Sequence, residues 1–549
     1  MTFKILLYTS LILLGAGLVY RFQAIARKQR FFERDRDTLA KKIFSINFKG
    51  FLLNTLFQIK LFRAGKFRWL AHFLVISGFV YLVAVHALDD VTYVMFPEYQ
   101  PTIDPFRFLR NLAGAGVTLG CVLFLVRRLI RSRVNQDHSV QDKGFQFRGI
   151  VSILLILALV LSGFLLEATR IMSEPRFNEM VEEYSDLDGD DDLIHLKAFW
   201  VENYHVVFKE NFLPFTVDLE IGETLNGDYC LDCHAKPDSA FVSTPLAKIS
   251  KEMGNWLAYV RVDNILYWFH YAMVLILICF LPFSRMFHLI AVPLTSTRKR
   301  ITPQNLKKEM GYLDVFSLSA CTNCGFCSEV CSVYPNFQIT GNPEILPHVK
   351  IDTVKTMAGK GLWDAKTVGR LRSGNDDCTL CGRCADICPS GIDLVRLWEA
   401  ADNLMVNLGC QNNYTLAQEA TFDEWSKQDQ LPGDPDAGSS MDLGLSDQVE
   451  AFEHCVQCTI CTNACPVVAY DLNQNDFGPH QVMNLLRLGK KQMAQGSRMV
   501  WNCLTCYSCQ EFCPQGIRVT DILLELRAGG QKTTDRIKLS KLNNQVSDK

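Results

Sequence analysis

The chain has 549 residues, of which 48% are hydrophobic and 21% charged, and its formal net charge is −2. This length has room for about three or four domains, and the near-neutral charge gives no sign of nucleic acid as a partner. The 21 cysteines are too many and too clustered for a disulfide-stapled secreted domain in a chain of this size, and they indicate metal centres instead.

Five apolar stretches in the first 290 residues are long enough to cross a bilayer as helices. They cover residues 3–20, 69–88, 108–130, 149–169 and 265–290. The first could be a signal peptide, but it lacks a small-residue cleavage site and a basic segment follows it. We therefore interpret this stretch as a signal anchor that stays in the protein.

Basic residues cluster at alternate ends of these stretches. With five spans counted, all of these clusters fall on one side of the membrane, and the positive-inside rule makes that side cytoplasmic. The N-terminus and the loop 172–262 are then periplasmic, and the chain after residue 295 is cytoplasmic, at the cytoplasmic membrane of a bacterium or archaeon. The clusters are Arg21, Arg27, Lys28 and Arg30; Arg63, Lys66 and Arg68; Arg127, Arg128, Arg131 and Arg133; Lys143 and Arg148; and Arg298, Lys299 and Arg300.

Histidines inside the apolar stretches indicate a functional site, because a polar side chain is costly in a membrane. The second stretch carries His72 and His86, and the fifth carries His270 and His288. In a continuous helix each pair falls on one face, ~21 Å and ~27 Å apart respectively. Because the two helices run antiparallel, the four histidines form two pairs at matched depths, and each pair would ligate one b haem. The pairs are His86 with His270 and His72 with His288. The alternative is that some of them are interfacial histidines satisfied by the backbone.

The segments Arg68-Trp-Leu-Ala-His72, Trp268-Phe-His270 and Arg285-Met-Phe-His288 resemble the five-helix dihaem cytochrome b of the nitrate reductase gamma family. They are also similar to the E-type membrane subunits of heterodisulfide reductases. The resemblance covers residues 1–300 and implies a membrane cytochrome b domain that reacts with menaquinone or another quinone near one haem. The long outer loop departs from this pattern.

The outer loop contains Cys230-Leu-Asp-Cys233-His234, which matches the C-x-x-C-H attachment site of a c-type haem. Its cysteines would bind the haem covalently, and its histidine would be one axial ligand. The alternative is a local disulfide or a zinc pair. Candidates for the second axial ligand are His205 and His195, with Met253 behind them.

Four copies of C-x2-C-x2-C-x3-C follow in the second half of the chain. In this bacterial ferredoxin spacing the fourth cysteine ligates the other cluster of a pair, so four motifs predict four 4Fe–4S clusters in two modules; zinc is the rival metal. Cys388 would therefore join the first three cysteines of the motif that begins at Cys321, and Cys331 those of the motif that begins at Cys378. In the second module, Cys513 would join the Cys455 motif and Cys465 the Cys503 motif. The motifs are Cys321, Cys324, Cys327 and Cys331; Cys378, Cys381, Cys384 and Cys388; Cys455, Cys458, Cys461 and Cys465; and Cys503, Cys506, Cys509 and Cys513.

The segments between paired motifs look helical and are longer than in a compact ferredoxin. The layout resembles the α-helical ferredoxin fold of heterodisulfide reductase C-type subunits, here duplicated. The predicted architecture is mainly α: a five-helix transmembrane dihaem cytochrome b bundle followed by two α-helical-ferredoxin-type modules. The soluble segments are a first module at 301–410, a linker at 411–447, a second module at 448–530 and a polar, frayed tail at 531–549.

The sequence therefore predicts an electron-transfer subunit of a respiratory complex. Electrons would pass between a periplasmic c haem or a quinone, two b haems and four cytoplasmic clusters. We find neither a G-x-G-x-x-G dinucleotide fingerprint nor a twin-cysteine CCG motif, so we expect a cytoplasmic flavoprotein or CCG-type partner to perform catalysis, and a periplasmic cytochrome c is a further partner. The alternatives are a self-sufficient quinol-oxidising reductase and a redox sensor.

Overall fold

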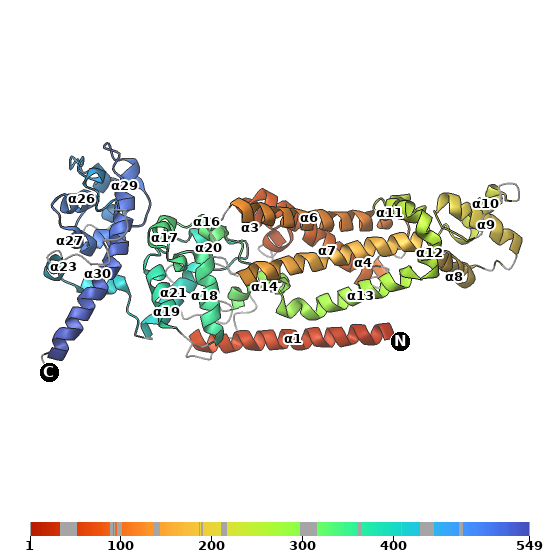
Figure 1. Cartoon of the computed structure of the whole chain (residues 1–549), viewed down its shortest axis with the longest axis horizontal. Coiled ribbons are helices and arrows are strands. Elements are labelled where there is room, and N and C mark those ends of the chain that lie inside the picture. Colours follow the sequence, from red (N-terminus) through yellow and green to blue (C-terminus); the bar gives the residue numbers. More distant parts are fainter. Residues whose placement is uncertain are drawn as a thin grey trace. The chain divides into compact units, whose positions relative to one another are not determined.

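The structure is a computed structural model that describes residues 2–32, 52–87, 92, 94–95, 102–134, 143–185, 187, 190–209, 217–296, 316–360, 364–407, 409–428, 444–470 and 476–547. These residues form helices, and within them we find no strand beyond an isolated bridge between Ser173 and Val207. The chain divides into two compact units, residues 1–22 with 57–287 and residues 23–56 with 288–549, coloured along the sequence in Figure 1. The mainly α prediction is confirmed.

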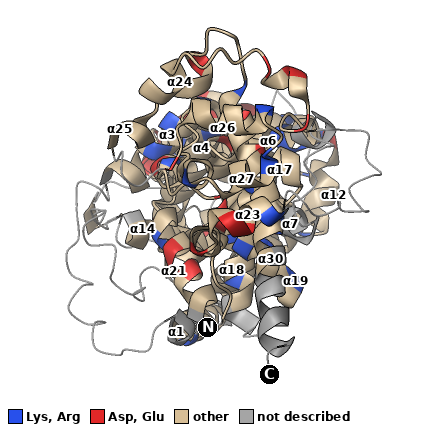
Figure 2. Cartoon of the chain, turned by 90° about the vertical axis from the view of Figure 1, so that its left-hand side faces the viewer, with Lys and Arg blue, Asp and Glu red and all other residues tan. Residues whose placement is uncertain are grey.

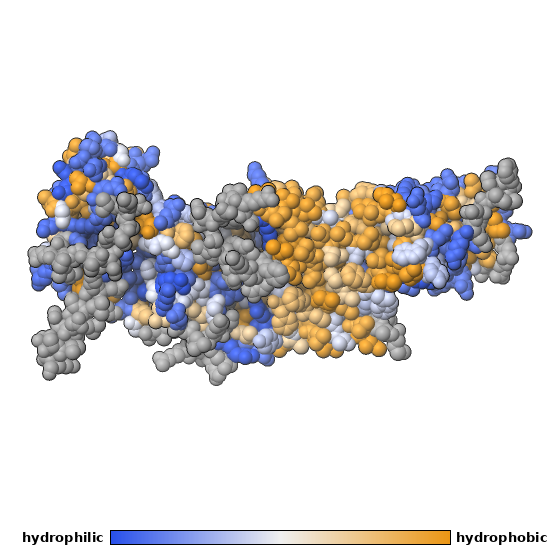
Figure 3. All heavy atoms as spheres, viewed as in Figure 1, coloured by the Kyte–Doolittle hydropathy of each residue, from blue (hydrophilic) through white to orange (hydrophobic). Residues whose placement is uncertain are grey.

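Five helices are long and apolar enough to cross a membrane, as predicted. The candidate spans are Ile5–Arg27, Lys66–His86, Phe106–Ile130, Gly149–Met172 and Val262–Phe283. On the face seen in Figure 3, apolar side chains form a continuous band over this part of the first unit, as expected of a surface that faces lipid. The spans belong to α1 (Thr2–Phe32), which begins in this unit, α4 (Lys66–Ala87), α6 (Phe106–Val134), α7 (Lys143–Met172) and α13 (Val262–Phe280) with the short η5 (Leu281–Phe283).

Glycines bring α4 and α6 into close contact. A Cβ on Gly78 would lie 2.6 Å from the Ala113 carbonyl oxygen, and one on Gly120 would lie 2.7 Å from the Ala71 carbonyl oxygen. Small residues permit such close approach, which is how membrane helices gain packing energy without a hydrophobic driving force. The histidine-bearing helix α4 is thereby held against α6.

The fifth predicted span, 265–290, is not one helix. The α-helix α13 ends at Phe280, and two short 3₁₀ turns, η5 and η6 (Arg285–Phe287), precede α14 (His288–Ser296). Pro282 lies in η5, and Ser284 is extended at φ −94° and ψ 176°. Proline lacks the N–H that would continue the helix, and its ring opposes the preceding turn. The prediction that His270 and His288 share one helical face is therefore wrong.

The outer loop folds as a small helical domain at one end of the first unit. Its core contains Phe177, Leu196, Phe199 and Trp200, together with Cys230 of the C-x-x-C-H segment. The aromatic rings pack edge to face, with Phe177 5.1 Å from Trp200. The domain comprises α8 (Glu174–Tyr184), α9 (Asp190–Asn203), α10 (Leu219–Tyr229), η3 (Pro237–Ser239), α11 (Ser243–Ser250), η4 (Lys251–Met253) and α12 (Gly254–Tyr259); α3 (Ile59–Ala64) precedes α4.

The second unit contains both cysteine modules. In the view of Figure 2, acidic and basic residues are interspersed over its helices. The first module holds η8 (Leu318–Ala320), α16 (Phe326–Glu329), α17 (Tyr334–Thr340), η9 (Pro343–Ile345), α18 (Pro347–Lys360), α19 (Ala365–Asp376), α20 (Arg383–Ile387) and α21 (Leu394–Asn407). The second holds α22 (Asn413–Glu419), α23 (Phe422–Gln428), η11 (Val449–Ala451), α24 (Ile460–Asn463), α25 (Pro466–Tyr470), α26 (Pro479–Arg487), α27 (Lys491–Gly496), α28 (Arg498–Asn502), α29 (Ser508–Glu511) and α30 (Val519–Ser547), and η1 (Leu52–Leu56) also belongs to this unit.

Two predicted boundaries in this unit differ from the structure. The first half of the 411–447 linker forms α22 and α23, and Trp425 is fully buried in the core of the second module. The segment after residue 530 continues α30, where Thr533, Thr534 and Ile537 are buried. The remaining linker residues 429–443, the start of the first module at 301–315, and the basic cluster Arg298, Lys299 and Arg300 lie outside the described residues.

Candidate functional site

The sixteen motif cysteines gather into four groups of four. Three groups line cavities of about 370, 290 and 350 Å³, measured with their openings to solvent. In each group, three cysteines come from one motif and the fourth is the last cysteine of the partner motif. These groups are Cys331 with Cys378, Cys381 and Cys384; Cys465 with Cys503, Cys506 and Cys509; and Cys513 with Cys455, Cys458 and Cys461.

The fourth group shows the same exchange. The thiol of Cys388 interacts electrostatically with those of Cys321 and Cys324, and Cys327 interacts with Cys321, Cys324 and Cys388. The structure thus places together the sets of residues that the ferredoxin spacing predicts as ligands.

A repeated backbone signature shapes the four cysteine loops. In every motif the residues immediately before and after the second cysteine have positive φ. Non-glycine residues rarely adopt this left-handed conformation, and such strain is concentrated at functional sites. The bends wrap the loop around a common centre, and a short helix begins directly after the second bend. The residue pairs are Asn323 and Gly325, Leu380 and Gly382, Gln457 and Thr459, and Thr505 and Tyr507.

Burial makes these thiols poor anions by themselves. It raises the pKa of Cys384, Cys388 and Cys509 to about 12, and it raises the pKa of Cys503 as well. Metal ligation requires the thiolate, so a cationic metal centre must supply the missing charge compensation. Within the described ranges, no three His, Cys, Asp or Glu side chains converge on one point as the ligands of a single ion would. Four thiols around one cavity fit a multi-iron cluster.

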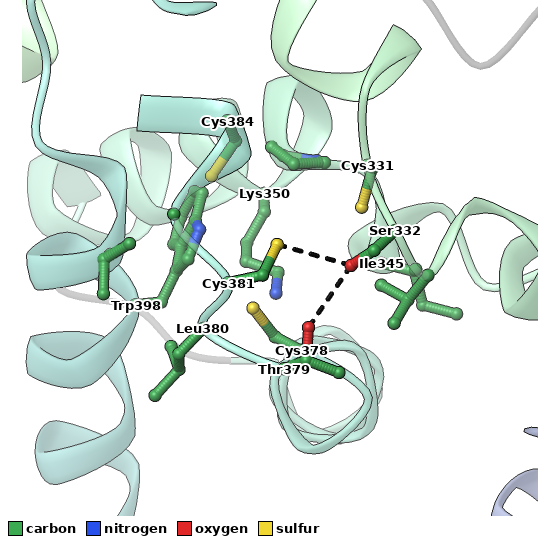
Figure 4. A pocket seen from close by; sticks show the side chains of 14 residues that line it. Cys331, Ser332, Ile345, Lys350, Cys378, Thr379, Leu380, Cys381, Cys384 and Trp398 are labelled. Carbon is green, nitrogen blue, oxygen red and sulfur yellow. Dashed lines mark hydrogen bonds between the residues drawn. The ribbon is translucent and has the colours of Figure 1, made fainter. Parts of the chain in front are cut away.

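The group around Cys378 lies beside a buried cation. Lys350 is 1% exposed, lines the same cavity and points into it between Trp398 and the thiols (Figure 4). Its Nζ donates to the Gly374 carbonyl at 2.9 Å and lies 5.0 Å from the centre of the Trp398 ring. A buried positive charge favours the more negative, reduced form of a nearby redox centre.

The helix α30 joins this group to the second module. Ser373 donates to Gln531 Oε1 at 2.5 Å, and Gln531 Nε2 donates to Asp377, the residue before Cys378, at 2.9 Å. One turn earlier on α30, the buried Arg527 donates to the Cys503 carbonyl at 2.7 Å. The Cys378 group and the Cys503 group therefore face the junction between modules from its two sides.

The C-x-x-C-H segment follows α10. Cys230 is buried and Cys233 exposed, and the His234 N–H donates to the Cys230 carbonyl at 2.8 Å. Burial, together with the charge of Arg107, lowers the pKa of His234. The neutral imidazole is the form that binds iron.

Hydrogen bonds join this segment to the start of α6 and to Thr102, which precedes that helix. Arg107 Nη1 donates to the Ala235 carbonyl at 2.7 Å, the Thr102 hydroxyl donates to the Cys233 carbonyl, and the Ala235 N–H donates to the Thr102 carbonyl at 3.2 Å. On the other side, the Tyr204 hydroxyl donates to the His234 carbonyl at 3.2 Å. The C-x-x-C-H segment is thus fixed directly to a candidate membrane helix.

The three candidates for a second axial ligand differ in their surroundings. His195 Nδ1 accepts the Asp218 N–H at 2.8 Å, so the proton of its neutral ring lies on Nε2. Met253 is 55% exposed. His205 has φ 63°, and its Nε2 is buried without a hydrogen bond to the described residues, with Asp238 Oδ1 3.7 Å away. Burial lowers the pKa of His205, which leaves it a neutral ring.

The three membrane histidines of the first unit share one hydrogen-bond pattern. His86 Nδ1 donates to the Leu82 carbonyl at 2.9 Å, and His72 Nδ1 donates to Gln58 Oε1 at 2.8 Å. The Ser162 hydroxyl donates to Leu159, so it accepts from His270 Nδ1 at 2.9 Å. In each neutral ring, Nε2 then carries the lone pair, which is the pattern of metal-ligating histidines.

His86 lies near enough to His270 to influence it electrostatically, as their predicted pairing requires. His288, by contrast, begins α14 in the second unit. Its pairing with His72 stays a prediction from sequence. Among the features described above, the paired left-handed residues, Lys350 and the α30 junction had no counterpart in the sequence analysis, because tertiary contacts create them.

Comparison with known proteins identifies the cysteine modules. Residues 317–392 and 451–517 match the family model of the 4Fe-4S dicluster domain. The chain therefore carries two such domains, in agreement with the four motifs. No solved structure matches the chain.

Relatives with similar sequences belong to heterodisulfide reductases. The C subunit of the ferredoxin/F420H2-dependent CoB-CoM enzyme of Methanosarcina acetivorans is 40% identical over 78 residues, which are 13% of this chain and 42% of that protein. The C subunit of the H2:CoB-CoM heterodisulfide,ferredoxin reductase of Methanothermobacter thermautotrophicus is 29% identical over 89 residues, 15% and 46% respectively. The D subunit of the dihydromethanophenazine enzyme of Methanosarcina mazei is 33% identical over 120 residues, 20% and 29%. The chain spans less than half the length of each.

Proposed function

We propose that this chain is the membrane-bound electron-transfer subunit of a heterodisulfide-reductase-like respiratory complex. Its two dicluster domains and its similarity to the C-type and D-type iron–sulfur subunits support the electron-transfer role. Four 4Fe–4S clusters, two b haems and one c haem would be its cofactors. A quinone, a cytoplasmic flavoprotein or CCG-type catalytic subunit, and a periplasmic cytochrome c would be its partners.

The crossed cysteine grouping carries this proposal. The contacts of α30 bring Asp377 and Cys503 to the module junction, so the Cys378 and Cys503 clusters would be the inner pair of a linear order and the Cys321 and Cys455 clusters its two ends. Electrons entering at one module would cross the junction between Asp377 and Arg527 and leave from the other. A chain of centres in this order suits a conduit better than a single substrate site.

The membrane part would connect that relay to the other side of the bilayer. His86 with His270 would hold an outer b haem and His72 with His288 an inner one, each through Nε2. Cys230 and Cys233 would attach the c haem, with His234 and His205 as axial ligands. His205 is favoured over His195 because its buried Nε2 makes no hydrogen bond within the described chain, although the Asp238 carboxylate lies 3.7 Å away. The basic flanks favour a cytoplasmic location for the clusters.

The test uses oriented membrane vesicles. A membrane-impermeant reductant supplied only to the periplasmic face should reduce the iron–sulfur clusters, as followed by electron paramagnetic resonance. In His72→Ala the outer haems should become reduced while the clusters stay oxidised. Equal cluster reduction in this variant would show that electrons do not travel through the inner haem, and the membrane domain would then be a quinone site and anchor.

A further inference from the structure

Three arginines lie near the end of the helix bundle that carries His72. They are Arg21 on α1, Arg128 on α6 and Arg285 in η6, and all belong to the first unit. A Cβ added to Gly149, near the start of α7, would lie 2.7 Å from Arg128 Nη2 and would overlap Arg285 Nη1. These two guanidinium groups are therefore within about 5 Å of each other, where like charges repel. Arg21 lies 5.2 Å from the ring centre of Phe287, two residues after Arg285.

Two of these cations are partly buried and have no balancing carboxylate in the described part of the chain. Arg21 Nε and Arg128 Nη1 make no hydrogen bond with any residue that the structure describes. No carboxylate in the described ranges forms an ion pair with Arg21 or Arg128. Buried charged groups need a partner, and guanidinium groups prefer carboxylate or phosphate oxygens.

The position of Arg128 indicates which anion this is. The Phe124 ring lies edge-on to His72, with 6.4 Å between ring centres. Arg128 follows four residues later on α6 and so lies on the same helix face, about 6 Å further along the axis. An anionic group bound by Arg128 would therefore sit one helical turn from the imidazole of His72.

We propose that Arg21, Arg128 and Arg285 bind the propionate carboxylates of the b haem that His72 ligates. This inference rests on the proposed function, because it requires a haem at His72. A haem is the one proposed ligand of this region that carries two carboxylates on the same edge, and two carboxylates match paired guanidinium groups. Arg128 and Arg285 thereby orient the haem edge toward this end of the bundle. Their positive charges favour the reduced form of the haem, so removing either charge makes its reduction harder.

The experiment is a spectroscopic redox titration of the purified holoprotein. Arg128→Gln and Arg285→Gln should shift the midpoint potential of one b haem to a more negative value or lower its occupancy, while the other b haem is unchanged. His72→Ala identifies which signal belongs to that haem. Arg128→Lys keeps the positive charge, so its b-haem potential should stay close to that of the wild type. Arg127→Gln, on the neighbouring α6 position, is the matched control and should leave both potentials unchanged.

Two results would overturn the inference. If both b-haem potentials stay unchanged in Arg128→Gln while native mass spectrometry shows the loss of a co-purified anionic phospholipid, the site binds a lipid phosphate. If the potentials and the lipid content are both unchanged, the arginines bind neither. A wild-type protein without b haem would instead refute the proposed function, so the two failures are distinguishable.

Discussion

Replacing Lys350 by methionine should lower the reduction potential of the cluster held by Cys331, Cys378, Cys381 and Cys384. The side chain lines that cavity and is 1% exposed, so solvent screens its charge weakly. A unit charge about 7 Å from the cluster at an effective dielectric constant of about 20 contributes about 2 kcal/mol. For a one-electron couple this corresponds to a shift of about 100 mV. Methionine has a similar length, so packing against Trp398 should be kept.

The assay is a redox titration of the purified chain followed by electron paramagnetic resonance. A Cys381→Ser variant assigns the signal of this cluster, and Lys366→Met is the matched control because Lys366 is exposed on α19. One of four midpoint potentials should fall in Lys350→Met and none in Lys366→Met. Four unchanged potentials would refute the inference that the buried ammonium tunes this centre. A change in all four would indicate general disruption of the fold.

Three further predictions concern other parts of the chain. Burial raises the pKa of Glu344 above its usual 4.5. The folded state therefore disfavours the ionised carboxylate, and stability falls as the pH rises from the unfolded-state pKa through the folded-state pKa. Glu344→Gln should raise the melting temperature at about pH 8, and this gain should shrink toward about pH 5. Haem staining after denaturing electrophoresis should mark the wild-type chain and fail for Cys230→Ala with Cys233→Ala, since a covalent haem survives denaturation; an unstained wild-type band from a host that matures c-type cytochromes would remove the c haem. Gly78→Ala should lower b-haem content, because its Cβ would lie 2.6 Å from the Ala113 carbonyl oxygen, whereas Gly116→Ala, with 3.8 Å to Leu74, should be tolerated; equal haem content in both variants would contradict the close packing of α4 on α6.

The cysteine groups could be predicted from sequence because ligand spacing is a local constraint. The exchange of Cys331 and Cys388 between motifs follows from the C-x2-C-x2-C-x3-C pattern alone. The left-handed conformation of Thr459 and Tyr507 could not be predicted, because these residue types do not favour it. Lys350 lies between two motifs in the chain, and only folding brings it to the Cys378 group.

Two errors have physical causes that can be named. Apolar content alone predicts one span over 265–290, but Pro282 lies within this run, and a proline within an apolar run ends or bends a helix. The polar composition of the segment after residue 530 predicts a frayed tail. In the structure, Gln531 and Thr533 are buried through hydrogen bonds to Asp377 and Gln495. Polar composition excludes an apolar core, but it does not exclude a packed polar interface.

The position of α30 in the chain has a consequence for biosynthesis. The helix follows both modules in sequence, yet its Gln531 covers Ser373 and Asp377 of the first module. During translation the first module emerges well before this helix, so its junction face stays uncovered until the second module has been made. Iron delivered to the Cys378 group from that side has to arrive within this interval. A ribosome that pauses before α30 would lengthen the period in which the cluster can be inserted.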